Sequence, residues 1–132
     1  MSALDTDVLV RHLVRDDRKQ FEASVRLVGA CLAQGKPLFV PVTVALELEW
    51  ALRSKFGLTK VDVIRSISSL LSAIELHFES ERALEQALGR CRDGQADFSD
   101  GLHAALAARA GRAPLWTFDR AAAGLEGAAL LA

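Results

Sequence analysis

Four aspartates stand where short apolar runs give way to segments of helical periodicity. Asp5 follows a two-residue apolar run, and Asp119 follows Leu115–Thr117 after one phenylalanine. Asp97 and Asp100 stand at the start of an alanine-rich helical segment. In parallel α/β domains the ligand site lies outside the carboxyl ends of the strands, so one edge of the fold can gather such carboxylates. Crowded carboxylates repel one another, and divalent cations that prefer oxygen ligands relieve this repulsion.

Each of these aspartates also has a purely structural explanation. Aspartate is a favoured N-cap because its side chain accepts the free amide hydrogens of the first helical turn. Asp7, which lies in the first turn after Asp5, is best explained by the helix dipole, with an outer carboxylate of a metal site as the alternative. The number of acids at such junctions, more than any one of them, favours a metal-binding function.

Two glutamates share the predicted helix over residues 44–56, and their neighbours distinguish them. Glu49 has Arg53 four residues later, the favourable orientation for an ion pair, so we expect Glu49 to be solvated at the surface. Glu47 has no basic residue at its helical neighbour positions. A carboxylate without a local counter-charge needs water or a metal ion, and the sequence leaves these two alternatives open.

Other residues that could do chemistry give weaker signals. His103 lies three residues after Asp100, but no other histidine or cysteine stands at ligand spacing, so we expect a structural or solvent-facing role. Thr117 lacks a histidine base and is not expected to be a nucleophile. Trp50 and Trp116 are expected in the core, as most large aromatic residues are. No glycine-rich nucleotide-binding loop is present.

The elements that must position these residues alternate between helices and short strands. Apolar residues at helical spacing predict helices over residues 7–14, 21–33, 44–56, 61–73, 81–91 and 99–110. Short apolar runs predict strands over residues 3–4, 38–40, 74–78, 115–117 and 128–131. This alternation predicts an α/β fold with a small parallel sheet covered by helices.

The composition limits the class of protein further. The chain has 132 residues, of which 51% are hydrophobic and 25% charged, and this is the size and balance of one globular domain. A formal net charge of −1 excludes a strongly basic nucleic-acid coat and a polybasic membrane binder. Two cysteines are too few for a disulfide scaffold, and no apolar run reaches the roughly 20 residues that span a bilayer. Without a basic leader before its first acid, the chain is expected to lack a signal peptide and to be cytoplasmic.

Four segments together resemble the PIN-domain family, and within it the VapC-type toxins of bacterial toxin–antitoxin pairs. They cover residues 4–11, 46–52, 97–102 and 117–119 and read LDTDVLVR, LELEWAL, DFSDGL and TFD. Their order, their spacing and the chain length agree with the family, so the resemblance covers residues 1–132 as a single PIN domain. The resemblance implies a three-layer α/β/α sandwich around a small central parallel sheet.

The resemblance also implies a chemistry, the cleavage of RNA with Mg²⁺ or Mn²⁺. The acids that correspond to the family's catalytic residues are Asp5, Glu47, Asp100 and Asp119. The residues expected to surround them are Thr6, Asp7, Asp97 and Thr117. Among these residues, Asp5 and Asp100 are expected to bind the metal directly. Relatives commonly have asparagine at the position of Asp7, and the extra negative charge there bears on the affinity for metal and its pH dependence.

The resemblance implies two protein partners, a cognate antitoxin and a second copy of the chain. The apolar helices over residues 44–56 and 61–73 are expected to contribute to the homodimer interface. Basic residues that follow the first two segments are candidates to hold RNA phosphates beside the cut, with a solvated charged surface as the alternative for each one. They are Arg11, Arg15, Arg18, Lys19, Arg53, Lys55 and Lys60.

Three alternative functions remain. A PIN-fold nuclease that processes RNA without an antitoxin differs little in sequence from a toxin, although the small size favours the toxin. A haloacid-dehalogenase-type phosphatase also begins with Asp-x-Asp after a strand, but the lysine that it needs is missing after Lys60. An inactive binding module of the same fold is disfavoured because the acidic set is intact.

Overall fold

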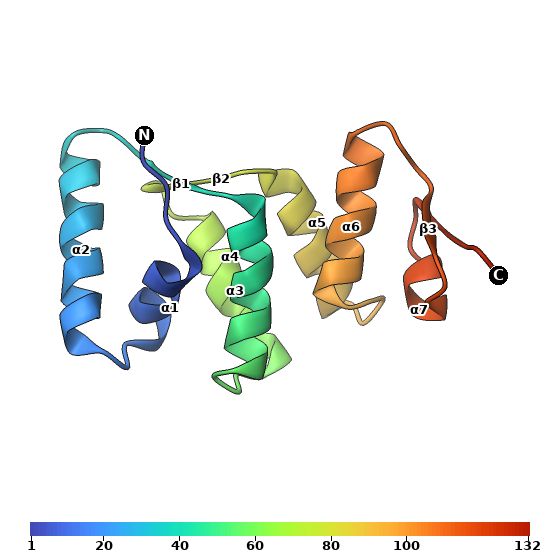
Figure 1. Ribbon diagram of the computed structural model, residues 1–132, viewed down its shortest axis with the longest axis horizontal. Coiled ribbons are helices and arrows are strands. Elements are labelled where there is room, and N and C mark those ends of the chain that lie inside the picture. Colours follow the sequence, from blue (N-terminus) through green and yellow to red (C-terminus); the bar gives the residue numbers. More distant parts are fainter. The chain divides into compact units, whose positions relative to one another are not determined.

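The computed structural model describes residues 1–132 and consists of two compact units, Met1–Glu79 and Ser80–Ala132. Each unit combines helices with one pair of parallel strands, and Figure 1 follows their order along the chain. None of the helices has both the length and the apolar character needed to cross a bilayer. Cys31 lies in the first unit and Cys91 in the second, and neither forms a disulfide.

The first unit contains four helices and two strands. Their bounds are α1 Thr6–Val14, α2 Arg18–Ala33, β1 Leu38–Val40, α3 Val42–Ser54, α4 Lys60–Leu71 and β2 Leu76–Phe78. Helix α1 packs against α2 and α3, while α4 packs against α3 and β2 (Figure 1). The core of the unit consists of aliphatic side chains from β1, α3 and α4, and its most deeply buried members are Leu38, Val40, Leu48, Leu52 and Ile67.

The chain enters helix α1 from a strand-like segment beside β1. Ala3 forms a single parallel bridge with Phe39, and the main-chain N–H of Leu4 donates to the carbonyl of Phe39 at 2.9 Å. The buried side chain of Leu4 anchors this segment in the core. Asp5 follows directly and caps α1, so its position is determined by the end of one element and the start of the next.

The second unit contains three helices and two strands. Their bounds are α5 Glu81–Arg92, α6 Phe98–Arg109, β3 Leu115–Thr117, α7 Arg120–Ala123 and β4 Ala128–Leu130. Helices α5 and α6 pack closely at Gly101, which has no side chain. A Cβ added there would lie only 3.4 Å from the Cα of Ala87. Strands β3 and β4 pair in parallel, α6 contacts β3, and α7 contacts both strands.

These elements confirm the predicted α/β class and its parallel strand pairing. Strands β1 and β3 begin and end at the predicted residues, whereas the predicted first strand is reduced to the bridge at Ala3. Helix α7 was not predicted, because its four residues are too few to show a helical period.

The prediction that both tryptophans lie in the core is wrong. Trp50 is 48% exposed, because it lies across α3 from the buried Leu48 and Leu52. Trp116 is 61% exposed, because the side chains of a strand alternate and its neighbours on β3 face the opposite way.

Candidate active site

Asp5 has the structural role that its sequence position suggested and is also accessible to solvent. It is the N-cap of α1, and its carboxylate accepts a hydrogen bond from the main-chain N–H of Thr6 at 2.7 Å. The residue is nevertheless exposed. Capping by one oxygen therefore fixes the carboxylate at the helix start and leaves it open to a ligand from solvent.

Thr6 joins the first predicted acid to the second. Its side chain is buried, and its hydroxyl donates a hydrogen bond to Oε1 of Glu47, which lies 41 residues further along the chain on α3. Glu47 is exposed. Because Thr6 is adjacent to Asp5, this bond holds the Glu47 carboxylate near the N-terminus of α1.

A cavity of about 240 Å³ opens at this point, between the start of α1 and the outer side of α3. Its acidic lining consists of Asp5, Asp7 and Glu47. The charged and aromatic side chains that complete it are Arg11, Trp50, Lys55 and Phe56. The cavity therefore brings together two of the four predicted catalytic acids, Asp5 and Glu47, with Thr6 and Asp7 from the predicted surrounding set.

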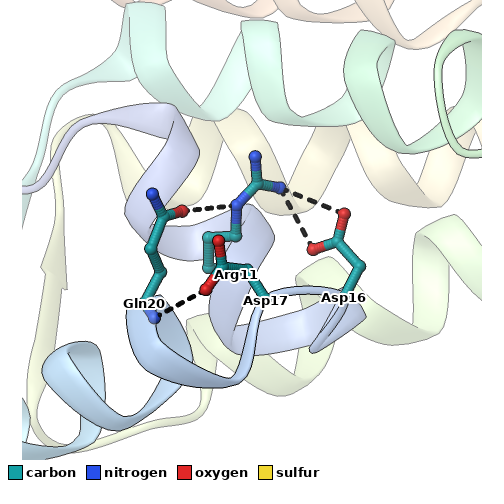
Figure 2. Close-up of polar contacts among 4 residues, drawn as sticks. All are labelled: Arg11, Asp16, Asp17 and Gln20. Carbon is teal, nitrogen blue, oxygen red and sulfur yellow. Dashed lines mark hydrogen bonds and ion pairs between the residues drawn. The ribbon is translucent and has the colours of Figure 1, made fainter.

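Arg11 is held at the cavity by residues of the following loop and helix (Figure 2). Its Nε donates to Oε1 of Gln20 at 2.6 Å, and its Nη1 donates to the Asp16 carboxylate at 3.2 and 3.4 Å. Asp17 caps α2 by accepting from the main-chain N–H of Gln20 at 3.0 Å, which fixes the helix turn that carries Gln20. Arg11 was a predicted phosphate contact, but its partners Asp16 and Gln20 were not predictable from the sequence, because the 3.6-residue period of a helix does not extend across the break between α1 and α2.

The second unit holds the remaining predicted acids. Asp97 is the N-cap residue of α6 but makes no capping hydrogen bond through its side chain, and Asp100 lies in the first turn of the same helix. Asp119 caps α7 by accepting from the main-chain N–H of Ala122 at 2.9 Å. Thr117 accepts from the main-chain N–H of Asp119 at 3.0 Å and so positions that residue at the end of β3.

The Asp100 carboxyl is perturbed both by burial and by the neighbouring acids of the second unit. Burial raises the pKa of the Asp100 carboxyl above its ordinary value, and the negative charges of Asp119 and Asp97 raise this pKa further. His103 acts in the opposite direction and lowers the pKa. An added cation near Asp100 would favour its charged form, because opposite charge lowers the pKa of a carboxyl group.

Glu49 forms the predicted ion pair with Arg53 but is not solvated as expected. The Nε of Arg53 lies 3.0 Å from Oε2 of Glu49, and Glu49 is only 7% exposed. The expectation is wrong because Glu49 lies within the apolar stripe of α3, four residues after Ala45 and three before Leu52, both of which are buried. Glu47, which is exposed, lies away from this stripe.

The acidic residues thus form two groups, one in each unit. Asp5, Asp7 and Glu47 share the cavity of the first unit, while Asp100 is electrostatically coupled to Asp97 and Asp119 in the second. Within either unit, no group of three or more histidine, cysteine, aspartate or glutamate side chains is arranged to hold a metal ion. That both groups contribute to one metal site stays a prediction.

Comparison with protein families identifies the class to which this fold and these acids belong. The family model described as PIN domain matches residues 3–127. The chain belongs to the PIN-domain family, and the predicted PIN-like α/β fold class is confirmed. PIN domains are in general nucleases that act on RNA, so membership indicates a nuclease and disfavours the phosphatase alternative. Comparisons with curated proteins and with solved structures gave no match.

Proposed function

We propose that this protein is a metal-dependent endoribonuclease and that it acts as the toxin of a toxin–antitoxin pair. The observation that carries the nuclease proposal is the hydrogen bond from Thr6 to Glu47, which holds two acids from distant parts of the sequence at one cavity. Family membership over residues 3–127 supports the same function. On this proposal residues 1–132 work as a single PIN domain.

The proposed roles follow the acidic residues of both units. The catalytic acids are Asp5, Glu47, Asp100 and Asp119, and the residues that support them are Thr6, Asp7, Asp97 and Thr117. Asp5 and Asp100 are proposed to bind the metal directly. Support for Asp5 comes from its exposure at the cavity. Support for Asp100 comes from its raised pKa, which is caused first by burial and then by the negative charges of Asp119 and Asp97, since a cation would relieve that repulsion.

The donor chemistry fits Mg²⁺ or Mn²⁺, because the acids offer carboxylate oxygens of the kind that hard divalent cations prefer. When bound, such an ion would offset the negative charge of a phosphodiester and lower the pKa of a water molecule, so that hydroxide is available as the nucleophile at neutral pH. The chain's own residues prepare for this step. The main-chain N–H of Thr6 orients the Asp5 carboxylate, and the Thr6 hydroxyl orients Glu47. One oxygen of Asp119 is fixed by the start of α7.

The experiment that tests this proposal is cleavage of total cellular RNA by the purified protein, freed of any antitoxin. We expect cleavage with Mg²⁺ or Mn²⁺, none with EDTA, and none from the Asp5→Asn variant, which keeps the size of the side chain but loses its charge. Mapping the cut ends then identifies the RNA substrate. Full cleavage by Asp5→Asn would show that the proposed mechanism is wrong.

The toxin role is tested by growth experiments, separately from the cleavage assay. Expression of the protein alone should arrest growth, and co-expression of a small protein from a neighbouring reading frame should restore it. Harmless expression of a soluble and active nuclease would remove the toxin role and favour the second candidate, an RNA-processing PIN nuclease without an antitoxin. We place the protein in the cytoplasm, where cellular RNA is available to it.

A homodimer is the remaining part of the proposal. Val61 on α4 is 62% exposed, so this helix offers apolar surface beyond what the first unit covers, and α3 is proposed to contribute to the interface beside it. Light scattering at tens of micromolar protein, with antitoxin absent, should give twice the mass of one chain. A strict monomer under these conditions contradicts this assignment.

A further inference from the structure

The cavity of the first unit has an aromatic wall that the proposed cleavage chemistry does not use. Trp50 lines the cavity and is half-exposed. An exposed indole contributes little to the core, but it offers a broad apolar face to a ligand. Bases of single-stranded nucleic acids stack on such faces, and the stacking tolerates any sequence because every base has a π-face.

The ammonium group of Lys55 lies over the Trp50 ring. The Nζ of Lys55 lies 5.7 Å from the centroid of the Trp50 ring, and Lys55 also lines the cavity. Exposed cation–π contacts are weak. A base that stacks on Trp50 can therefore displace the ammonium group from the ring, and the freed ammonium can pair with a neighbouring phosphate.

A second cation at the cavity is held rigidly. Gln20 and Asp16 engage Nε and Nη1 of Arg11, and the third nitrogen of the guanidinium group points away from both partners in Figure 2. The Arg11 side chain is 28% exposed. A guanidinium group that is already oriented loses less conformational entropy when it binds a phosphate than a free side chain does.

We infer that this cavity binds an unpaired nucleotide of single-stranded RNA, with its base stacked on Trp50 and the adjoining phosphates at Arg11 and Lys55. Arg11 and Lys55 offset the negative charge of the acids on the same cavity, which would otherwise repel the RNA backbone. Both faces of a base inside a duplex are covered by its neighbours, so the same contact selects single strands over double strands. This inference rests on the proposed nuclease function and defines its substrate class.

The binding test uses a fluorescein-labelled single-stranded RNA of about twelve nucleotides, and the same RNA annealed to its complement. Every protein carries Asp5→Asn so that binding is measured without cleavage. We expect the single strand to bind more tightly than the duplex. Trp50→Ala should weaken binding of the single strand roughly 5- to 150-fold, the range for loss of one base–aromatic stack, and Trp50→Phe should retain most of the affinity.

Matched controls separate this contact from general effects. Trp116→Ala removes a tryptophan that is also exposed but lies on β3, outside the cavity, and should leave the affinity unchanged. Arg11→Gln should reduce the slope of log affinity against log salt by about 0.7, as expected for one phosphate contact on a single strand. Arg65→Gln, which removes an exposed arginine paired with Asp62, should not change this slope.

A direct readout covers the case in which Trp50→Ala fails to fold. In a Trp116→Phe variant Trp50 is the only tryptophan, and its fluorescence should be quenched when single-stranded RNA binds. Unchanged fluorescence at saturation, equal affinity of Trp50→Ala, or equal binding of the duplex would each overturn the inference. If the wild-type protein still cleaves RNA in these cases, the nuclease function stands. If the wild-type protein neither cleaves nor binds any RNA, the proposed function fails together with this inference.

Discussion

Glu47 and Glu49 lie two residues apart on α3, and substitution of each by glutamine should have opposite consequences. Glu49 is buried, and Arg53 reaches both of its oxygens, with Nε at 3.0 Å and Nη2 at 3.4 Å. Glu49→Gln removes the charge and places an amide group against the guanidinium group. Hydrogen bonds to charged groups contribute about 1.5–3 kcal/mol to stability. Because half of the Arg53 side chain is exposed and water can solvate it, we expect a loss at or below the lower end of this range, about 1–2 kcal/mol.

This loss converts into a measurable melting temperature. Unfolding entropy near 60 °C is about 2.1 cal/mol/K per residue, so for 132 residues a loss of 1–2 kcal/mol lowers the midpoint by about 4–7 °C. Glu47→Gln should lower it by much less, because Glu47 is exposed and glutamine still offers an oxygen to the Thr6 hydroxyl.

Cleavage should show the reverse order. Glu47→Gln should abolish metal-dependent RNA cleavage, whereas Glu49→Gln should retain it at temperatures where the variant is folded. Both variants are measured by thermal denaturation and by cleavage of the same RNA. If Glu49→Gln loses cleavage while Glu47→Gln keeps it, the assignment of the two helix faces and the proposed role of Glu47 are both wrong.

Three further predictions concern other parts of the molecule. Because the pKa of Asp100 is raised, the folded protein loses stability as the pH rises from the ordinary aspartate pKa through the raised one. Asp100→Asn should therefore melt at a higher temperature than wild type at pH 7 in EDTA, and the difference should vanish in acid. A lower melting temperature of the variant at pH 7 would contradict this. Asp16→Asn should weaken RNA binding through Arg11 without changing the melting temperature, and unchanged affinity would remove its positioning role. Gly101→Leu should destabilise the protein by about 1–3 kcal/mol in urea denaturation, because the leucine side chain would meet the main chain of Ala87. Unchanged stability would show that α5 and α6 can separate at little cost.

The sequence predicted the α/β class and most element positions because the apolar runs and helical periods are strong local signals. It also predicted the ion pair of Glu49 with Arg53, but not the burial of Glu49. The i, i+4 spacing of Glu49 and Arg53 indicates an ion pair and says nothing about burial, which depends on what packs against α3. The buried positions Ala45 and Leu52 did carry the signal, since their spacing encloses Glu49.

Contacts between distant residues were beyond the reach of the sequence. Nothing local indicates that the Thr6 hydroxyl meets Glu47, because 41 residues separate them and only the packing of α1 on α3 brings them together. The exposure of Trp50 was mispredicted because large aromatic residues are usually buried, and one residue's place on a helix outweighs that tendency. The hydrogen bonds from Arg11 to Gln20 and Asp16 likewise depend on how the chain turns between α1 and α2.

Helix α1 is only nine residues long, yet together with its cap it supplies Asp5, Thr6, Asp7 and Arg11 to the cavity. Their positions therefore all depend on the packing of this one helix. If this helix detached while α3 and the strands kept their places, the cavity would lose the carboxylates of Asp5 and Asp7 and the guanidinium group of Arg11. Amide hydrogen exchange detects such local opening. The amides of α1 thus report how often the site disassembles, and any ligand that bridges α1 and α3 should slow their exchange.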